Sequence, residues 1–376
     1  MSAGPGSESR GALRVAWVVG AQLEGRLPAR ERVLASGGTG LVRYRWVADE
    51  VNRRPELGLR YFLYRPWRGH DALLFLKSMG PRSLALLQRA QRRGRLTVFD
   101  ANVNYYERSG TEHYAGMLPS RQQTEDAVAM TRAADAVIAD SPFLEQAAAR
   151  HARRVAWIPD SVRMDLVPPQ RSWRLKDGAL RLLWCGESLK LFELLAIADV
   201  LRRHAGRIEL VLVTNDLVAL ERWAPGHRAG FEALLRDVPH RIVPYRSVEH
   251  LFEVYSHGGV VISPRHLDNS YNLGHTEWKI TLGMACGRMI LCSPVPSYVK
   301  VAERSGGRGI RVCEDAEQWD RALGSLLSAQ TDLAGEERAA REVVERFYAT
   351  SVVAEAHARL LRSLFDEGGP TAGPAQ

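Results

Sequence analysis

Short apolar runs alternate along this chain with longer stretches whose apolar positions recur every three or four residues. The short runs are typical of strands buried on both faces, and the longer stretches are typical of helices packed against a sheet. In the first half of the chain the expected strands cover residues 13–20, 59–65, 72–76, 97–99, 136–138 and 155–158. This alternation predicts an α/β fold with a doubly wound, Rossmann-like domain.

A proline-bearing stretch without periodicity interrupts the alternation, which then starts again. The expected strands of the second half cover residues 180–186, 208–213, 241–243, 259–262, 289–292 and 310–312. We therefore divide the chain into an N-terminal domain (11–166), a linker (167–179), a C-terminal domain (180–345), terminal helices that close the structure (346–367) and a disordered tail (368–376). Two doubly wound domains in tandem bring the carboxyl ends of both sheets to one cleft, where the functional site is expected.

The composition is that of an ordinary globular protein. Its 376 residues exceed what one core usually serves, and 45% of them are apolar. The 51 lysines and arginines outnumber the 43 acidic residues, and arginines such as Arg89, Arg92 and Arg93 lie along expected helices. This pattern favours solvated helix faces over contact with an anionic lipid surface or substrate. No basic stretch carries the interleaved aromatic residues of a single-stranded nucleic-acid groove, so we expect no nucleic-acid partner.

The cysteines and the N-terminus bear on the compartment. All four cysteines lie in the second half, mostly in apolar contexts, which predicts free thiols in a reducing compartment. No cysteine or histidine spacing is that of a zinc site, so we expect no metal. The first ten residues have no apolar core, and no run approaches about 18 apolar residues. We expect a cytoplasmic protein that is at most peripheral to the inner face of the membrane.

The most informative stretch is residues 268–287, where a polar loop, a helix rich in small residues and a glycine stop precede a short apolar strand. The helix is expected to begin at His275 or Thr276, so that its first unpaired N–H groups suit a phosphate. On this helix His275 and Lys279 share one face, whereas Glu277 lies off it. Spacing alone does not separate this anion site from an ordinary crossover helix with a solvated lysine.

Several motifs occur in the order in which they occur in a known family. Residues 131–141, followed by 158–162, resemble the segment that ends the N-terminal domain of GT-B-fold glycosyltransferases of the family 4 type. Residues 180–186 with Lys190 resemble the opening of the C-terminal domain of these enzymes, and residues 278–287 resemble their nucleotide-sugar motif. The resemblance covers most of the chain.

The resemblance implies a metal-independent, retaining, hexosyltransferase-like enzyme of glycan biosynthesis. A nucleotide-sugar donor would bind to the C-terminal domain, and a glycan, lipid-linked or small-molecule acceptor to the N-terminal domain. Lys190 would pair with the donor diphosphate, which the backbone amides of His275 and Thr276 would also bind. Neutralising this diphosphate is the principal catalytic need, because the leaving group gains negative charge. No Asp-x-Asp pair occurs, and no cofactor other than the donor is expected.

The donor motif departs from the family pattern. The two glutamates of the family, spaced E-x7-E, fall on Gly274 and Leu282, so the carboxylate that grips the donor ribose is missing and Glu277 is the candidate substitute. A related branch has Lys-Ser-x-x-Lys here, and residues 275–279 resemble a variant of it. The departure leaves open a GT-B-like protein that binds a nucleotide or glycan without transferase activity. A Rossmann dehydrogenase is disfavoured, because the glycine-rich loop at 36–40 does not directly follow the first strand.

Candidate site residues come from the resemblance and from positions at strand ends. The catalytic candidates are Lys190, His275 and His113, the last as a contact to the transferred sugar. The donor-binding candidates are Gly38, Thr39, Gly186, Glu187, Ser188, Arg246, Asn272, Gly274, Thr276, Glu277 and Lys279. The acceptor-binding candidates are Asp100, Asn102 and Tyr105, which follow the strand at 97–99. Plainer interpretations as turn, capping or surface residues remain for most of them.

Overall fold

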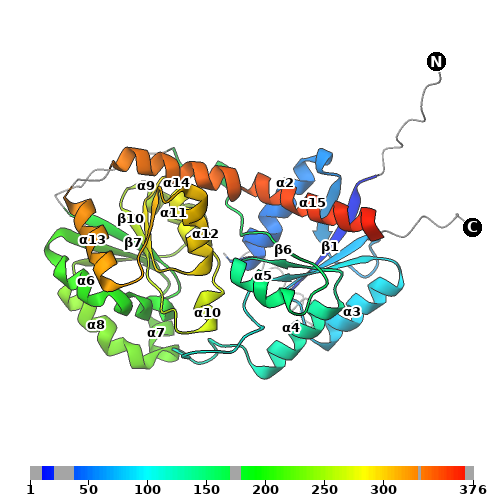
Figure 1. Ribbon diagram of the computed structural model, residues 1–376, viewed down its shortest axis with the longest axis horizontal. Coiled ribbons are helices and arrows are strands. Elements are labelled where there is room, and N and C mark those ends of the chain that lie inside the picture. Colours follow the sequence, from blue (N-terminus) through cyan, green and yellow to red (C-terminus); the bar gives the residue numbers. More distant parts are fainter. Residues whose placement is uncertain (1–10, 21–37, 170–178, 329–331, 369–376) are drawn as a thin grey trace, which may run out of the picture.

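The computed structural model of the protein contains two parallel six-stranded sheets, each flanked by helices (Figure 1). It describes residues 11–20, 38–169, 179–328 and 332–368. The first sheet has the order β2-β1-β3-β4-β5-β6. Its strands are β1 (Leu13–Val19), β2 (Leu59–Leu63), β3 (Ala72–Leu76), β4 (Leu96–Ala101), β5 (Ala136–Ala139) and β6 (Val155–Trp157). The chain order reverses beside β1, where Val15 lies opposite Tyr61 on one side and Ala72 on the other.

The second sheet repeats this design in the order β12-β11-β10-β7-β8-β9. Its strands are β7 (Leu180–Cys185), β8 (Ile208–Thr214), β9 (His240–Pro244), β10 (Val260–Ser263), β11 (Ile290–Cys292) and β12 (Ile310–Val312). The order reverses beside β7, where Leu183 lies opposite Val211 and Val261. In a doubly wound sheet, ligands bind outside the carboxyl ends of the strands at this point.

Helices cover both faces of the first sheet. Its helices are α2 (Trp46–Arg53), α3 (Pro81–Arg92), α4 (Arg121–Ala133) and α5 (Pro142–Ala149), and a π-helical turn (Gly40–Arg45) leads into α2. One core contains residues of α2, such as Val47 and Val51, and the core on the other face contains Leu87 of α3 and Met130 of α4. Ser120 caps α4 through a capping box with Gln123.

The second sheet is covered in the same way. One face carries the 3₁₀ stretch Ser188–Ile197 with α6 (Ala198–Arg203), α7 (Val218–Trp223), α8 (Arg228–Asp237) and α13 (Ala316–Leu327). The other face carries α9 (Val248–Ser256), α11 (Trp278–Ala285), α12 (Pro296–Ser305) and α14 (Leu333–Phe347). Short 3₁₀ turns lie at Pro55–Leu57, Met164–Leu166, Ala205–Arg207 and Pro225–His227. The small helix α10 (Ser270–Leu273) lies in the loop between β10 and α11.

The last helix, α15 (Thr350–Gly368), returns to the N-terminal domain (Figure 1). Its residues Val353 and Leu361 belong to the same core as β1 and α2. The chain turns between α14 and α15, where Ala349 bridges to Val162 of the N-terminal domain. The C-terminal segment therefore joins the two domains a second time.

The sequence predicted the fold in detail. All twelve expected strands are present in the described residues, with ends that agree within two residues. The expected α/β fold with two doubly wound domains is confirmed. Most of the expected linker (170–178), Gly37 of the glycine-rich loop and most of the expected tail (369–376) lie outside the described residues.

The prediction that the helix after the polar loop begins at His275 or Thr276 is wrong. The helix α11 begins at Trp278, and the separate helix α10 precedes it, capped by the Asn269 side chain, which accepts from the Asn272 amide. Asn272 therefore lies inside α10, and Gly274 follows its end. The polar residues of the loop form a small helix of their own because Asn269 satisfies its first turn.

No helix in the described ranges combines the length and apolar character needed to cross a bilayer.

Candidate functional site

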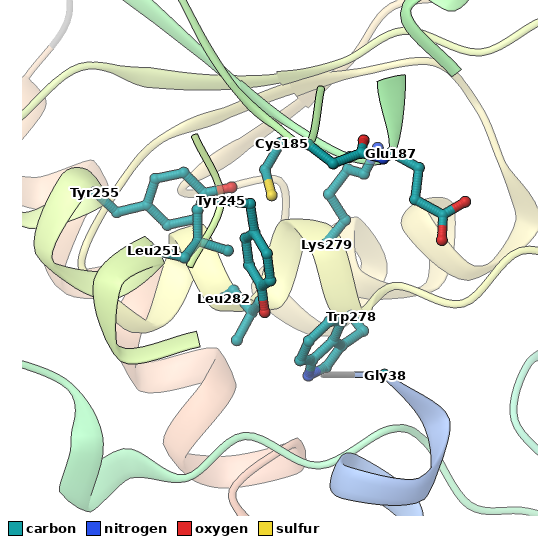
Figure 2. Close-up of a pocket in the computed structure, with 11 residues that line it drawn as sticks. Gly38, Cys185, Glu187, Tyr245, Leu251, Tyr255, Trp278, Lys279 and Leu282 are labelled. Atoms are coloured by element: carbon teal, nitrogen blue, oxygen red, sulfur yellow. The ribbon is translucent and has the colours of Figure 1, made fainter. Parts of the chain in front are cut away.

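A cavity of about 380 Å³ opens between the two domains at the carboxyl end of β7. Figure 2 shows Tyr245, Leu251 and Tyr255 on one side of it and Trp278 and Lys279 on the other. The remaining lining residues are Gly38, Cys185, Gly186, Glu187, Asn215 and Leu282. Only Gly38 comes from the N-terminal domain, so the C-terminal domain builds nearly the whole cavity wall.

The cavity wall of the C-terminal domain contains the side chain of Lys279. Lys279 is the second residue of α11, and its Nζ is buried with no hydrogen-bond partner in the described part of the chain. Nζ lies 4.7 Å from the Trp184 ring centroid. Burial lowers the pKa of Lys279 to about 7, and nearby Arg265 acts in the same direction. An anion in the cavity would supply the hydrogen bonds that the protein leaves unmade.

The end of β7 forms the floor of the cavity next to Lys279. A Cβ on Gly186 would lie 2.8 Å from the Trp184 ring and 3.1 Å from the Lys279 Nζ, so only glycine leaves this space open. Glu187 follows as an exposed lining residue. Ser188 is buried outside the cavity lining, and its amide donates to the Asn215 side chain at 2.7 Å. Gly186, Glu187 and Lys279, three of the predicted donor-binding residues, thus line one cavity.

Lys190 and His275 form a second polar group near the cavity. The Lys190 ammonium donates to His275 Nε2 at 3.3 Å and lies 5.2 Å from the Tyr271 ring centroid. Burial lowers the pKa of His275 well below its usual value, with Arg265 and Lys190 adding to the effect. Burial also opposes the Lys190 charge, but Tyr271 and Glu193 raise the pKa of Lys190 above its usual value. With its pKa lowered, His275 is suited to accept the hydrogen bond from Lys190 as a neutral imidazole.

Arg265 is a buried cation that sequence reasoning missed. It follows β10, and its guanidinium pairs with Glu193 at 2.6 Å in a fully enclosed ion pair. The pKa values of His275 and Lys279 are both lowered by its charge. The strand-end rule that selected Glu187 applies equally to Arg265 and could have found it.

Residues at and just before the start of α11 hold the two domains together. Thr276 Oγ1 donates to Asp160 at 3.0 Å, and the Trp278 indole donates to the Ser161 carbonyl at 3.1 Å. The Ser141 hydroxyl donates to the Gly274 carbonyl at 3.2 Å. Thr276 and Gly274 therefore make contacts between the domains and are not part of the cavity lining.

Two further predicted donor contacts also lie apart from the cavity lining. The amide of His275 donates to the Asn272 carbonyl at 3.2 Å, so it already has a partner. The Asn272 side chain is buried and donates to the His266 carbonyl at 2.8 Å. The His275 amide, one of the two amides expected to bind the diphosphate, is thus already engaged within the loop.

Glu277 is buried outside the cavity lining. Neither of its carboxyl oxygens has a hydrogen-bond partner among the described residues. Burial raises the pKa of Glu277 to about 8, and the neighbouring Asp160 contributes. The position of the family's second glutamate, Leu282, lies in the apolar wall.

The N-terminal side of the cleft is held by paired charges. Buried Arg43 bonds Asp100 at 2.9 Å and Asp160 at 3.0 Å. The Asn102 side chain donates to the Thr39 hydroxyl at 2.9 Å, which ties the glycine-rich loop to the loop after β4. Burial raises the pKa of Asp100 to about 6, although Arg43 opposes this. Asp100 and Asn102 therefore have protein partners of their own.

Lys77 is a further cation on this side that the sequence did not suggest. Lys77 follows β3 and has a φ of 52°, in the left-handed region that non-glycine residues seldom adopt. Burial lowers the pKa of Lys77, while Tyr271, Asp140 and Asp160 act to raise it. Tyr105 is half-buried, and burial raises its pKa, with Tyr271 acting in the same direction.

The remaining predicted site residues are not part of the cavity lining. His113 bonds Asp268 at 3.0 Å and stacks on Phe192 with ring centroids 5.1 Å apart, so it joins the two domains. Arg246 is exposed, and its neighbour Tyr245 lines the cavity instead. Within the described ranges, no group of three or more histidine, cysteine, aspartate or glutamate residues has an arrangement that could hold a metal ion.

Comparisons with known proteins place the fold. No protein-family model and no curated protein matched this chain. Among solved structures, HepE from Anabaena in complex with UDP-glucose covers 94% of this chain and 100% of its own at 11% identity, with a TM-score of 0.63. A glycosyltransferase from Rickettsia africae covers 94% of this chain and 99% of its own at 13% identity, with a TM-score of 0.62. Sucrose-phosphate synthase from Thermosynechococcus elongatus covers 80% and 75% at 17% identity, with a TM-score of 0.58. These similarities show that the chain has the GT-B fold.

Proposed function

We propose that this protein is a glycosyltransferase that moves a sugar from a nucleotide-sugar donor to an acceptor hydroxyl. The observation that carries the proposal is Lys279, whose Nζ is enclosed beside the interdomain cavity without a hydrogen-bond partner in the described ranges. A buried ammonium group without a partner destabilises the folded protein unless an anionic ligand pairs with it. The neighbours with this fold include a protein crystallised with UDP-glucose, which favours a nucleotide-sugar as the ligand.

The cavity offers separate places for the two parts of such a donor. Tyr245, Tyr255 and Leu251 form an apolar wall on which a base and ribose can lie. Lys279 and the nearby Lys190 supply positive charge for the diphosphate. The open position at Gly186 lets a phosphate approach the backbone closely.

The chemistry that we propose is departure of the diphosphate, assisted by side-chain cations. As the bond between the anomeric carbon and the diphosphate breaks, the acceptor oxygen bonds to that carbon and its proton passes to the departing diphosphate. Lys190 and Lys279 stabilise the negative charge that grows on this leaving group. Retention of the anomeric configuration is part of the proposal, because the nearby N-terminal carboxylates do not suit a general base. Asp100 is bonded to Arg43, and Asp140 is buried with its pKa raised by burial and by Asp160. Acceptor glycans, lipid-linked sugars or small molecules would enter from the N-terminal side, near Lys77 and Tyr105.

A thermal-shift screen against UDP, GDP, ADP, CMP, TDP and NAD tests the proposal. A ligand at about 100 times its Kd stabilises the folded protein by about 2.7 kcal/mol. We expect stabilisation by one nucleoside diphosphate, and we expect Lys190→Ala to lose most of it. The control Lys300→Ala removes an exposed lysine that pairs with Glu303 on α12, and should leave the shift unchanged.

The matching sugar nucleotide is then incubated with candidate acceptors, and the anomeric proton of the product is read by NMR. Transfer with the donor's configuration supports the full proposal. Binding without turnover of any sugar nucleotide would favour a binding protein. A shift with NAD alone, or with none of the nucleotides, would overturn the proposal.

A further inference from the structure

The outer part of the N-terminal domain concentrates the positive charge of the chain. Between Arg60 and Arg95 the sequence has eight arginines and one lysine but a single acidic residue, Asp71. The net charge of this segment therefore equals the formal net charge of +8 for all 376 residues. Asp71 itself is engaged, since it pairs with Arg14 at 3.0 Å and with Arg95 at 3.5 Å.

Two elements bring these arginines to one surface. The loop between β2 and β3 and the end of α3 enclose a shallow depression of about 310 Å³. Arg68 comes from the loop and Arg89 and Arg93 from α3 or just beyond it. Burial raises the pKa of the Tyr64 phenol, and the positive charges of Arg89 and Arg93 act in the opposite direction. The arginines thus converge on one depression.

Five of the arginines have no ion-pair partner in the described part of the chain. Arg65, Arg68, Arg89, Arg92 and Arg93 are all exposed, and the ion pairs of the described residues do not include them. The Arg68 guanidinium lies 3.9 Å from the Phe62 ring centroid, which holds it at the rim. Elsewhere exposed arginines are commonly paired, as Arg121 is with Glu125.

Trp67 stands in the middle of this charge. Its side chain is 80% exposed, whereas the next most exposed large apolar side chain in the described residues, Val218, is 61% exposed. An indole this exposed contributes little hydrophobic burial to the fold. Tryptophan favours the interface of a lipid bilayer, where its ring is buried and its N–H stays hydrated.

We propose that this surface docks onto an anionic phospholipid bilayer. The basic tryptophan surface consists of Trp67, Arg68, Arg89 and Arg93, which line the depression, together with the exposed Arg65 and Arg92 that lie close to them in the sequence. Trp67 enters the interface, the arginines face anionic headgroups, and the depression accepts a lipid phosphate between Arg68, Arg89 and Arg93. A single exposed indole does not form the row of stacking rings that single-stranded nucleic acids use, which favours lipid as the partner.

The position of the surface is compatible with an open cavity. In Figure 1, α3 lies at the outer end of the N-terminal domain, whereas α11, which carries Lys279, lies in the C-terminal domain. A membrane bound at α3 would therefore leave the cleft free for donor and acceptor. This inference does not depend on the proposed transferase activity.

Vesicle co-sedimentation of the full chain tests the docking. We expect binding to vesicles of phosphatidylcholine mixed with phosphatidylglycerol, no binding to pure phosphatidylcholine, and weaker binding as salt rises. One cationic side chain near an anionic surface changes partitioning about fivefold, so Arg89→Glu with Arg93→Glu should weaken binding at least about 25-fold. Trp67→Ala should weaken it roughly tenfold.

Control variants distinguish vesicle binding through this surface from an effect of the overall positive charge of the protein. Arg236→Glu with Arg338→Glu reverses two exposed arginines of the C-terminal half, and Val218→Ala trims another exposed apolar side chain. Both controls should bind like the wild type, and all variants should keep the wild-type melting temperature. Brominated lipids should also quench a part of the tryptophan fluorescence that Trp67→Phe removes.

Three results would overturn the proposal. The first is absence of binding to the phosphatidylglycerol vesicles. The second is equal weakening by the control pair and by the Arg89 and Arg93 pair. The third is tighter binding to single-stranded nucleic acid than to vesicles, with no effect of Trp67→Ala on vesicle binding.

Discussion

Arg43 and Lys279 are cations on opposite sides of the same cleft, and their surroundings differ completely. Arg43 of the N-terminal domain bonds Asp100, Asp160 and the carbonyl of Ile158. Burial would lower the pKa of Arg43, but the two carboxylates raise it above its usual value. Lys279 of the C-terminal domain has no hydrogen-bond partner for its Nζ within the described ranges, and burial lowers its pKa to about 7.

The difference separates a structural charge from one that is kept for a ligand. A buried cation that is bonded on all sides cannot contact a substrate without giving up a partner, and its removal leaves carboxylates unpaired. A cation without partners weakens the folded state and gains its hydrogen bonds only when an anion arrives. The N-terminal side of the cleft is thus preorganised by its own charges, and we propose that Lys279 on the C-terminal side is completed by a ligand.

The largest expected effect is on stability at the paired site. Arg43→Met would leave Asp100 and Asp160 buried without their cation, and we expect a loss of about 3–5 kcal/mol in the free energy of unfolding. Guanidinium unfolding, followed by tryptophan fluorescence, measures it. A loss below about 1 kcal/mol would mean that Arg43 does not hold the N-terminal side together.

The unpaired site should respond in the opposite way. Lys279→Met removes a buried amine that has no hydrogen-bond partner in the described ranges, so the ligand-free protein should be as stable as the wild type or more so. Affinity for the nucleoside diphosphate should fall about 10- to 150-fold, because a charged hydrogen bond contributes about 1.5–3 kcal/mol. Calorimetric titration and thermal melting measure the two effects. Lower stability together with unchanged affinity would remove Lys279 from the site.

The pH dependence of nucleotide binding tests whether protonated Lys279 contacts the diphosphate. The folded-state pKa of Lys279 is lowered to about 7, so the free protein loses this proton as the pH rises through 7, whereas a diphosphate binds the protonated form. Affinity should therefore be full below pH 7 and fall by up to about tenfold per pH unit above it. In Lys279→Arg the decline should disappear, because a guanidinium stays protonated. A decline of equal slope in that variant would assign the titration to another group.

The smallest expected effect concerns a carboxyl group on the paired side. Asp140 is buried, its side-chain oxygens have no hydrogen-bond partner among the described residues, and burial raises its pKa well above the usual value. Asp140→Asn keeps the shape of the protonated acid and should change the free energy of unfolding by less than about 1 kcal/mol. Asp100→Asn breaks the bond to Arg43 and should cost several times more. Urea unfolding of both variants compares them, and similar losses would show that Asp140 is ionised.

The sequence by itself determined the architecture. The run at residues 72–76 is apolar throughout, and it forms β3 with the predicted ends. A parallel sheet covered on both faces requires such runs, so local composition is enough to locate its strands. The rule that ligands bind at carboxyl ends of strands also led from sequence to Gly186 and Glu187, which line the cavity.

Only the tertiary structure decided which charged residues are available to a ligand. Asp100 was a predicted acceptor contact, yet Arg43, 57 positions away in the sequence, bonds it. Thr276 was a predicted donor contact, yet it bonds Asp160 across the domain boundary at a separation of 116 residues. Glu277 and Lys279 are two residues apart, yet only Lys279 lines the cavity. Partners this distant are set by how the sheets, loops and domains pack, and burial and pairing then determine which charge remains for a substrate.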